Sequence, residues 1–219
     1  MMRLTVSCYN HSHGHGGGKG TVLMDEATEP AASAVRLVEY SSDWPLAFHD
    51  VESRVRLVFR SSVMRLDHIG STSVPGLLSK DVIDVQLGVE SLDLGLSAPL
   101  EQAGFLISEN IRRDHIPPGG LGDPADWAKR FATGTAGGHS VNLHVRRIGA
   151  SNWRYALLFR DFLRSSPVAS AAYARAKVLL APLCPSVDVY ADVKDPICDL
   201  VMVAAAAWGV QTGWDPLED

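Results

Sequence analysis

The stretch His68-Ile-Gly-Ser-Thr-Ser-Val-Pro-Gly-Leu-Leu-Ser-Lys-Asp-Val-Ile-Asp-Val85 carries most of the information in this 219-residue chain. The alternating residues of Met64–Ile69 predict a short strand that leads into it. Gly70–Gly76, rich in glycine and small hydroxyl residues, predicts a turn. Asp81–Val89 is rich in β-branched residues and predicts a second strand. The chain therefore runs strand, turn, strand at this point.

The predicted turn has the chemistry of a phosphate-binding loop. Gly70 and the residues after it can bring backbone N–H groups close to an anion. Ser71, Thr72 and Ser73 can donate hydrogen bonds to phosphate oxygens, and Lys80 adds a full positive charge. The alternative is purely structural, with the hydroxyl groups capping a helix that follows the turn.

Asp84 lies inside the second predicted strand. Because side chains alternate along a strand, one face carries Val82, Asp84 and Gln86, and the other carries Ile83, Val85 and Leu87. A carboxylate on a strand beside a phosphate-binding turn is a candidate Mg²⁺ ligand. Alternatively, Asp84 forms a structural ion pair with an arginine or a lysine.

The rest of the chain predicts an α+β fold. A helix is expected from Trp44-Pro45 onward, a second helix over Leu94–Gly104 and a strand beginning at Phe105. Asn110–Gly138 is polar and predicts a long loop with a short strand at Trp127–Phe131. A strand over Ser140–Arg146 and three helices follow, near Trp153–Arg164, Ala169–Leu183 and Val187–Gly209. Strands followed by consecutive helices indicate a C-terminal helical layer.

The predicted C-terminal helices carry basic and aromatic residues one helical turn apart. These pairs are Arg160 with Arg164, Tyr173 with Lys177, and Tyr190 with Lys194. They can form a basic wall opposite the turn, where arginine binds phosphate with two hydrogen bonds. The tyrosine rings can stack on a base or pack under the lysine stems. The alternative is a solvated face with ordinary ion pairs.

These residues resemble the GrpB family, also called UPF0157, whose fold belongs to the nucleotidyltransferase superfamily. The resemblance covers about Val35–Trp208, and its strongest part is the motif His68–Leu77. Further matches are Lys80, the acid of the second strand, Leu143-His144, Phe159–Arg164, and Tyr173 and Tyr190 with the lysines after them. The resemblance implies a nucleotidyltransferase-like mixed β-sheet with flanking helices.

The resemblance also implies a metal site, from which this chain departs. Members of the superfamily carry a Gly-Ser turn, two acids one position apart on the next strand, and a third carboxylate on a later strand. Here Asp84 matches the first acid, Gln86 stands at the second position, and Asn142 and His144 stand on the later strand. Asp81 faces away from Asp84 on a regular strand. This set supports at most one Mg²⁺ ion held together with substrate phosphates.

Two histidines are candidates for ligand binding or catalysis at the same site. His68 and His144 can orient phosphate, or serve as acid or base. The structural alternative for each is a half-buried, hydrogen-bonded side chain.

Two functions follow as hypotheses. In the first, this GrpB-type protein binds a nucleotide or another phosphorylated small molecule. If it is also an enzyme, the expected reaction is Mg²⁺-dependent nucleotidyl transfer. In the second, the domain is a non-catalytic folding or regulatory partner, because family members resembling it occur fused to dephospho-CoA kinase. That would link it to coenzyme A synthesis. The sequence leaves open whether the protein is an enzyme.

Composition excludes some classes of partner and indicates a compartment. The net charge of −5 argues against a broad nucleic-acid surface. No apolar run approaches the roughly 20 residues that span a bilayer, so no membrane partner is expected. Three widely spaced cysteines predict reduced thiols in a cytoplasmic protein.

The first 34 residues differ from the remainder in composition. Residues 1–34 are rich in glycine and histidine and predict a disordered tail and linker, before a single domain over 35–219. The alternating histidines of this tail could hold a metal ion or belong to a solvated segment; they are His11, His13 and His15, with Cys8 nearby.

Overall fold

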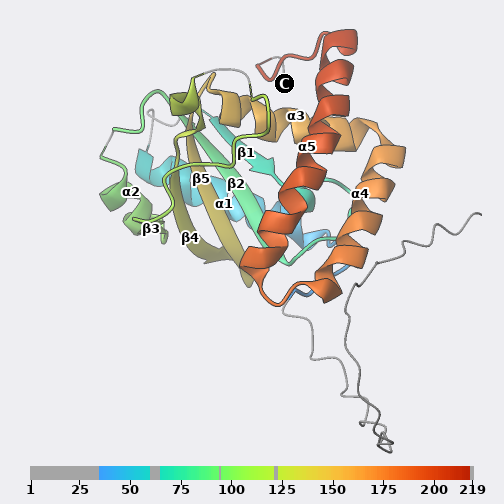
Figure 1. Ribbon diagram of the computed structural model, residues 1–219. Coiled ribbons are helices and arrows are strands. Elements are labelled where there is room, and N and C mark those ends of the chain that lie inside the picture. The colour runs from blue at the N-terminus through green and yellow to red at the C-terminus, as the bar shows by residue number, and fades with distance from the viewer. Residues whose placement is uncertain (1–34, 60–64, 94, 121–122, 218–219) are drawn as a thin grey trace, which may run out of the picture. The chain divides into compact units, whose positions relative to one another are not determined.

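A computed structural model describes residues 35–59, 65–93, 95–120 and 123–217. The expectations for the Gly/His-rich segment 1–34 therefore lie outside the described residues. The described part has an α+β architecture, in which helices cover both faces of one mixed five-stranded sheet (Figure 1). This confirms the predicted fold class.

The sheet has the strand order β1-β2-β5-β4-β3. Its strands are β1 (Arg65–Ile69), β2 (Val82–Val89), β3 (Leu106–Ser108), β4 (Arg130–Ala136) and β5 (His139–Arg147). β2 and β5 are parallel, and the other neighbours are antiparallel. The register pairs Asp84 with Asn142 and Gln86 with His144. The two strands therefore bring their polar side chains together on one face of the sheet.

The other face of the sheet is apolar and packs against α1 (Asp43–Phe59) and α2 (Ser97–Gln102). α1 contributes buried residues spaced three or four apart, which is one face of a helix. They are Trp44, Ala47, Val51 and Val55. The strands contribute Ile83, Val85 and Leu87 from β2, and Val141, Leu143 and Val145 from β5. The predicted alternation along the second strand is confirmed.

Three consecutive helices lie on the polar side of the sheet: α3 (Ser151–Ser165), α4 (Pro167–Leu180) and α5 (Val187–Thr212). Two begin at capping serines, because Ser166 Oγ accepts a hydrogen bond from the Ala169 N–H (3.3 Å) and Ser186 Oγ accepts one from the Val189 N–H (3.1 Å). Short 3₁₀ turns in the described part of the chain are η2 (Ser71–Ser73), η3 (Pro124–Trp127) and η4 (Ala181–Leu183). The predicted C-terminal helical layer is confirmed.

The segment predicted as one long loop contains a full strand. The prediction of a short strand over 127–131 is wrong, because Trp127 ends η3 and β4 runs over Arg130–Ala136. β4 joins β5 through Gly137-Gly138, whose φ values of 56° and 87° suit a tight hairpin turn. Its sequence of small and polar residues lacks a strong strand pattern, so pairing with β3 and β5 decides its conformation.

The turn after β1 also differs from one expectation. Ser71–Ser73 form a single 3₁₀ turn and do not lead into an α-helix. The turn therefore offers no α-helix N-terminus to an anion. Separately, the part of the chain that the structure describes contains no helix long and apolar enough to cross a membrane.

Candidate anion-binding cavity

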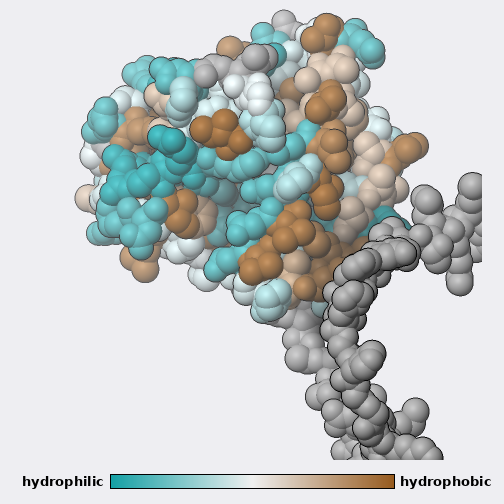
Figure 2. Space-filling view, in the orientation of Figure 1, coloured by the Kyte–Doolittle hydropathy of each residue, from teal (hydrophilic) through white to brown (hydrophobic). Residues whose placement is uncertain are grey.

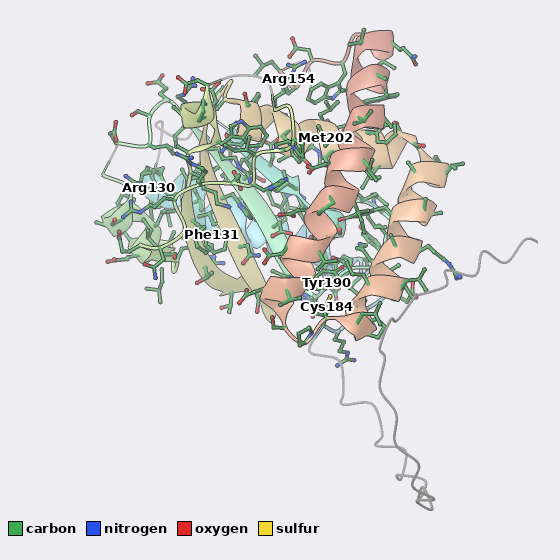
Figure 3. All side chains as sticks on the ribbon, viewed as in Figure 1. Arg130, Phe131, Arg154, Cys184, Tyr190 and Met202 are labelled. Atoms are coloured by element: carbon green, nitrogen blue, oxygen red, sulfur yellow. The ribbon has the colours of Figure 1, made fainter. Side chains whose placement is uncertain are left out.

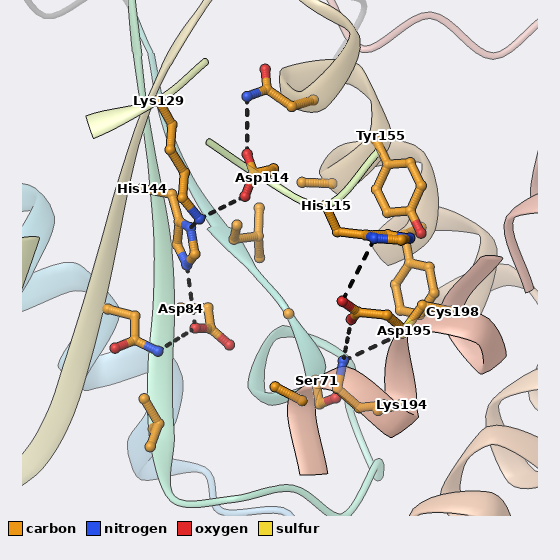
Figure 4. Close-up of a pocket in the computed structure, with 18 of the residues that line it drawn as sticks. Ser71, Asp84, Asp114, His115, Lys129, His144, Tyr155, Lys194, Asp195 and Cys198 are labelled. Carbon is orange, nitrogen blue, oxygen red and sulfur yellow. Dashed lines mark hydrogen bonds and ion pairs between the residues drawn. The ribbon is translucent and has the colours of Figure 1, made fainter. Parts of the chain in front are cut away.

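A cavity of about 430 Å³ lies between the polar face of the sheet and the helices α4 and α5. Figure 2 shows hydrophilic residues around the hollow beside α5, and Figure 4 shows the side chains that line it. The volume falls within the usual range for small-molecule sites. The charged, histidine and hydroxyl-bearing lining residues include Ser71, Lys80, Asp84, Arg113, Asp114, His115, Lys129, His144, Arg146, Lys177, Lys194 and Asp195.

The cavity is cationic although the chain is acidic. Six lysine and arginine side chains and three aspartates line it, so its formal charge is +3 with both histidines neutral. The whole chain has a net charge of −5. A concave surface with an excess of one charge concentrates ligands of the opposite charge. The cavity is therefore suited to an anion.

Gly70 brings the turn into close contact with Asp84. Its φ of 68° and ψ of −170° belong to a region that essentially only glycine adopts. A Cβ atom at Gly70 would lie 2.4 Å from Asp84 Oδ2. Glycine is required here for its backbone conformation and for space.

Only one of the three predicted hydroxyl residues of the turn reaches the cavity. Ser73 Oγ donates a hydrogen bond to the Gly70 carbonyl (2.6 Å), and Thr72 Oγ1 pairs with His68 Nε2 (3.0 Å). These two hydroxyl groups hold the turn together. Ser71 lines the cavity, and its Oγ lies 3.0 Å from Lys177 Nζ.

Asp84 lies at the cavity wall with 30% of its side chain exposed. Asn142 Nδ2 donates to its Oδ1 (3.0 Å), and His144 Nε2 faces the same oxygen at 3.6 Å. Burial raises the pKa of Asp84, but the contacts with His144, Asn142 and Lys80 together lower it by more. The pKa is therefore below its ordinary value. Asp84 is therefore an ionised, solvent-accessible carboxylate.

His144 is held neutral beside Asp84 (Figure 4). Lys129 Nζ and Arg146 Nη2 lie 3.4 Å and 3.3 Å from its Nδ1. Because both neighbours are donors, Nδ1 is the acceptor and the ring proton is on Nε2, toward Asp84. Burial and the positive charges of Arg146 and Lys129 lower the pKa of His144.

The side chains around Asp84 do not form a resident magnesium site. Among the described residues no group of three or more His, Cys, Asp or Glu side chains could hold a metal ion. Asn142 turns its donor toward Asp84, and Gln86, at the position of the second acid, accepts a hydrogen bond from Arg146 (2.6 Å). Mg²⁺ prefers several oxygen ligands in octahedral geometry. Asp84 alone supplies too few of them.

Sequence reasoning missed a charged network around Asp114. Its carboxylate accepts hydrogen bonds from Lys129 (2.6 Å), Arg146 (2.8 and 3.0 Å) and Asn152 (2.9 Å). Burial raises the pKa of Asp114, and the cations Arg146 and Lys129 lower it far below its usual range. The network fastens the segment before β4 to the sheet. Strand alternation after His144 could have placed Arg146 on this face, whereas no local pattern indicates Asp114.

Lys177 is the most unusual cation of the cavity. Its Nζ donates to Ser71 Oγ (3.0 Å) and to the Leu78 carbonyl (2.5 Å), and it lies 4.9 Å from the centre of the Tyr173 ring. No carboxylate among the described residues forms an ion pair with it. Burial, and then the charge of Lys194, lower the pKa of Lys177 to about 7.

The other predicted lysines also line the cavity, with buried tyrosines beside them. Lys80 Nζ lies 5.7 Å from the centre of the Tyr190 ring, and Lys194 Nζ lies 3.3 Å from Cys198 Sγ. Tyr173 OH lies 3.6 Å from the same sulfur atom. The ammonium groups of Lys80 and Lys177 therefore lie close to the rings of Tyr190 and Tyr173.

Arg160 and Arg164 lie behind the turn and are not among the residues that line the cavity. Arg160 donates to Asp161 Oδ1 (2.6 Å) and to the His68 carbonyl (3.3 Å). Arg164 donates twice to the Ser73 carbonyl (3.0 and 2.8 Å). Both guanidinium groups bind backbone oxygens of the β1–η2 region. The predicted basic wall is therefore formed by Lys177 and Lys194, without the arginines.

His68 is a buried structural residue behind the turn. Its ring stacks on Phe48 with centroids 5.1 Å apart. Burial is the main cause that lowers the pKa of His68, to about 4. The folded protein therefore holds this histidine neutral.

This histidine predicts a specific acid sensitivity. His68 takes up a proton near pH 6.5 in the unfolded chain, but only near pH 4 in the folded protein. Neutral His68 therefore favours the folded state fully above pH 6.5, and this part of the free energy of unfolding is lost as the pH falls toward 4. The loss reaches about 3 kcal/mol. We expect His68→Gln to show a smaller decrease than wild type between about pH 7 and pH 4.5 in urea titrations. Equal decreases in both proteins would contradict this role.

The fold and the cavity define an α+β protein with a cationic cavity between a glycine turn and a helical layer. The family model described as "GrpB protein" matches residues 34–203. The chain belongs to the GrpB family. This confirms the resemblance carried by the motif His68–Leu77.

Curated relatives differ in name and in length. A protein named "Dephospho-CoA kinase" from Mycolicibacterium paratuberculosis is 34% identical over 201 residues, which are 85% of this chain and 49% of that protein. "UPF0157 protein BH1888" of Halalkalibacterium halodurans is 34% identical over 183 residues, 82% of this chain and 86% of that protein. The chain thus spans about half the length of the relatives named as kinases.

A solved structure shares the fold. The crystal structure of the conserved protein GrpB from Enterococcus faecalis matches with a TM-score of 0.61 and 24% sequence identity. The match covers 82% of this chain and 100% of the other. At this identity the likeness concerns the fold alone.

Proposed function

We propose that the cavity binds a nucleotide or another phosphorylated small molecule. The observation that carries the proposal is the cationic lining of a concave site in a chain whose net charge is −5. Phosphate groups carry several strong acceptor oxygens and pair well with lysine and serine donors. A neutral ligand would leave the excess positive charge of the lining without compensation.

The positions of the donors suggest how a phosphate group would be held. Ser71 and Lys177 are 3.0 Å apart, so one phosphate group can accept hydrogen bonds from both. Lys80 and Lys194 line the same cavity and can bind further oxygens. Arg146 and Lys129 already compensate Asp114 and would act mainly through their charge. Asp84 is available to accept a hydrogen bond from a ligand hydroxyl or amine.

The proposal is for binding and does not extend to two-metal nucleotidyl transfer. Such a reaction needs carboxylates that hold two divalent ions close together. Among the residues that the structure describes, no second carboxylate lies beside Asp84, because Gln86 pairs with Arg146 and Asp114 with three donors. The expected Mg²⁺ is therefore proposed only as an ion that arrives with ligand phosphates.

The proposal predicts stabilisation by a phosphorylated ligand. We expect at least one member of a panel of nucleotides, coenzyme A, dephospho-CoA and pyrophosphate to raise the melting temperature, each tested with Mg²⁺ and with EDTA. A ligand at 100 times its dissociation constant adds about 2.7 kcal/mol, or roughly 5–10 °C. Lys194→Gln should reduce the shift, and Arg175→Gln, an exposed cation of α4 outside the cavity lining, should not. A panel without any shift would contradict the proposal.

A second candidate is a role as partner of a dephospho-CoA kinase in coenzyme A synthesis. It is supported by relatives of 34–36% identity that carry that name, in which the matched region is 40–49% of the protein. This candidate would be favoured if the purified chain changed the folding yield or activity of a separately expressed dephospho-CoA kinase while no ligand of the panel bound. No effect on the kinase would remove it.

A further inference from the structure

Helix α5 exposes a continuous row of apolar side chains on its solvent-facing side. Leu200, Val203 and Val210 are 73%, 71% and 86% exposed. Figure 2 shows hydrophobic residues one after another along this helix. The row consists of Val193, Pro196, Leu200, Val203, Ala207 and Val210.

The spacing of the row indicates a helix as its partner. Successive members are alternately three and four residues apart, which is the pattern of a helix that packs along a second helix. The neighbouring helix α4 also carries exposed apolar side chains, Val168 and Leu179, at 81% and 55%. Contiguous exposed apolar surfaces of this size mark interaction sites in water-soluble domains. No member of the row is charged, so no side chain of the row opposes burial.

We propose that this face pairs with the same face of a second copy of the chain, α5 against α5 in antiparallel orientation. A two-fold axis brings an identical row onto itself, so one surface supplies both halves of the contact. Alanines in the row and beside it, Ala204 and Ala207, allow the two helices to approach closely. The closed contact would bury the row of both copies at once.

Charge selects the antiparallel orientation. The exposed acids Asp188 and Asp192 lie near the N-terminal end of α5, and no charged residue follows Asp199 in the helix. Arg154 of α3 lies 4.9 Å from the centre of the Trp214 ring. Figure 3 labels Arg154 near the C-terminal end of α5. Antiparallel pairing keeps the acids of the two copies at opposite ends of the contact, and it sets the two helix dipoles in opposite directions, which is the favourable arrangement. Parallel pairing would place like charges side by side.

The available area suits a stable dimer. A stretch of about 18 residues is roughly 27 Å long, and two adjacent helices present a face about 20 Å wide. The face thus offers about 500 Å² in projection, and the accessible surface of interlocking side chains is larger. The accessible surface of the face is therefore of the order of the roughly 800 Å² that each partner buries in an ordinary interface.

The oligomeric state tests the proposal. We expect sedimentation velocity to give twice the chain mass of 23.6 kDa over roughly 10–100 µM. Leu200→Glu and Val203→Glu should each shift the protein to monomer, because pairing would bury their charge. Leu57→Glu is the matched control, since Leu57 is a 77% exposed leucine of α1, outside the row, and it should leave the dimer intact. A monomeric wild type at the highest concentration would overturn the proposal, whatever the variants do.

Disulfide trapping tests the orientation. In a background carrying Cys8→Ser, with Cys184 and Cys198 buried, we compare Val193→Cys, Val210→Cys and their mixture. Antiparallel pairing predicts rapid cross-linking only in the mixture. Cross-linking of each single variant with itself would show the parallel arrangement and overturn the antiparallel model.

Discussion

Gly70→Ala is expected to lower the melting temperature by roughly 10 °C and to abolish ligand binding. The new Cβ atom would lie 2.4 Å from Asp84 Oδ2, and the backbone conformation at Gly70 is one that alanine avoids. Strain of this kind costs about 3 kcal/mol, which corresponds to the stated shift for a domain of this size. The turn must also move away from β2, and this displaces Ser71 from Lys177.

Gly76→Ala is the matched control for this prediction. Gly76 also has a positive φ, of 78°, but a Cβ atom there meets nothing within 4 Å. Its substitution should cost only the conformational part, about 1 kcal/mol, and ligand binding should persist. Equal behaviour of the two variants in thermal melts and ligand titrations would mean that contact between the turn and Asp84 is unimportant.

Lys177→Met is expected to stabilise the protein and to weaken ligand binding by more than a hundredfold. Burial lowers the pKa of Lys177 to about 7, so at neutral pH the folded state favours the neutral amine more than the unfolded chain does. This costs several kcal/mol, partly offset by the hydrogen bonds to Ser71 and Leu78. We expect a net gain of about 2 kcal/mol in the variant. The ligand, in contrast, would lose a charged donor at the turn.

The same lysine predicts a pH dependence with a definite sign. Because the pKa of Lys177 is lower in the folded state, wild-type stability rises between about pH 7 and pH 10, and Lys177→Met removes this rise. An anionic ligand requires the protonated amine, so its affinity should fall toward tenfold per pH unit above pH 7. Calorimetric titrations at several pH values measure both effects. Arg175→Met removes an exposed cation two residues away on the same helix and should preserve the pH dependence.

The sequence predicts the frame of the site because that frame depends on local patterns. Alternation along β2 places Asp84 on the polar face of the sheet. The same alternation along the neighbouring strand β5 places Asn142 and His144 on that face. The spacing of Lys177 and Lys194 on their helices places both at the cavity. Helix and strand periodicity therefore suffices for these residues.

The remainder of the site depends on contacts between distant segments. Arg160 and Arg164 have the same helical spacing as the lysines, yet they bind the carbonyls of His68 and Ser73 behind the turn. Only the three-dimensional packing of α3 against β1 decides this. Asp114 comes from a segment without periodicity, and its place is fixed by Lys129 just before β4, by Arg146 of β5 and by Asn152. Local propensity contains no information about such pairs.

The most direct test of the account is a crystal structure with the tightest ligand of the panel bound. We expect a phosphate oxygen within about 3 Å of both Ser71 Oγ and Lys177 Nζ, with the ligand inside the cavity between Asp84 and α5. A ligand bound elsewhere, for example in the apolar groove between Val74 and Ala174, with this cavity empty, would contradict it.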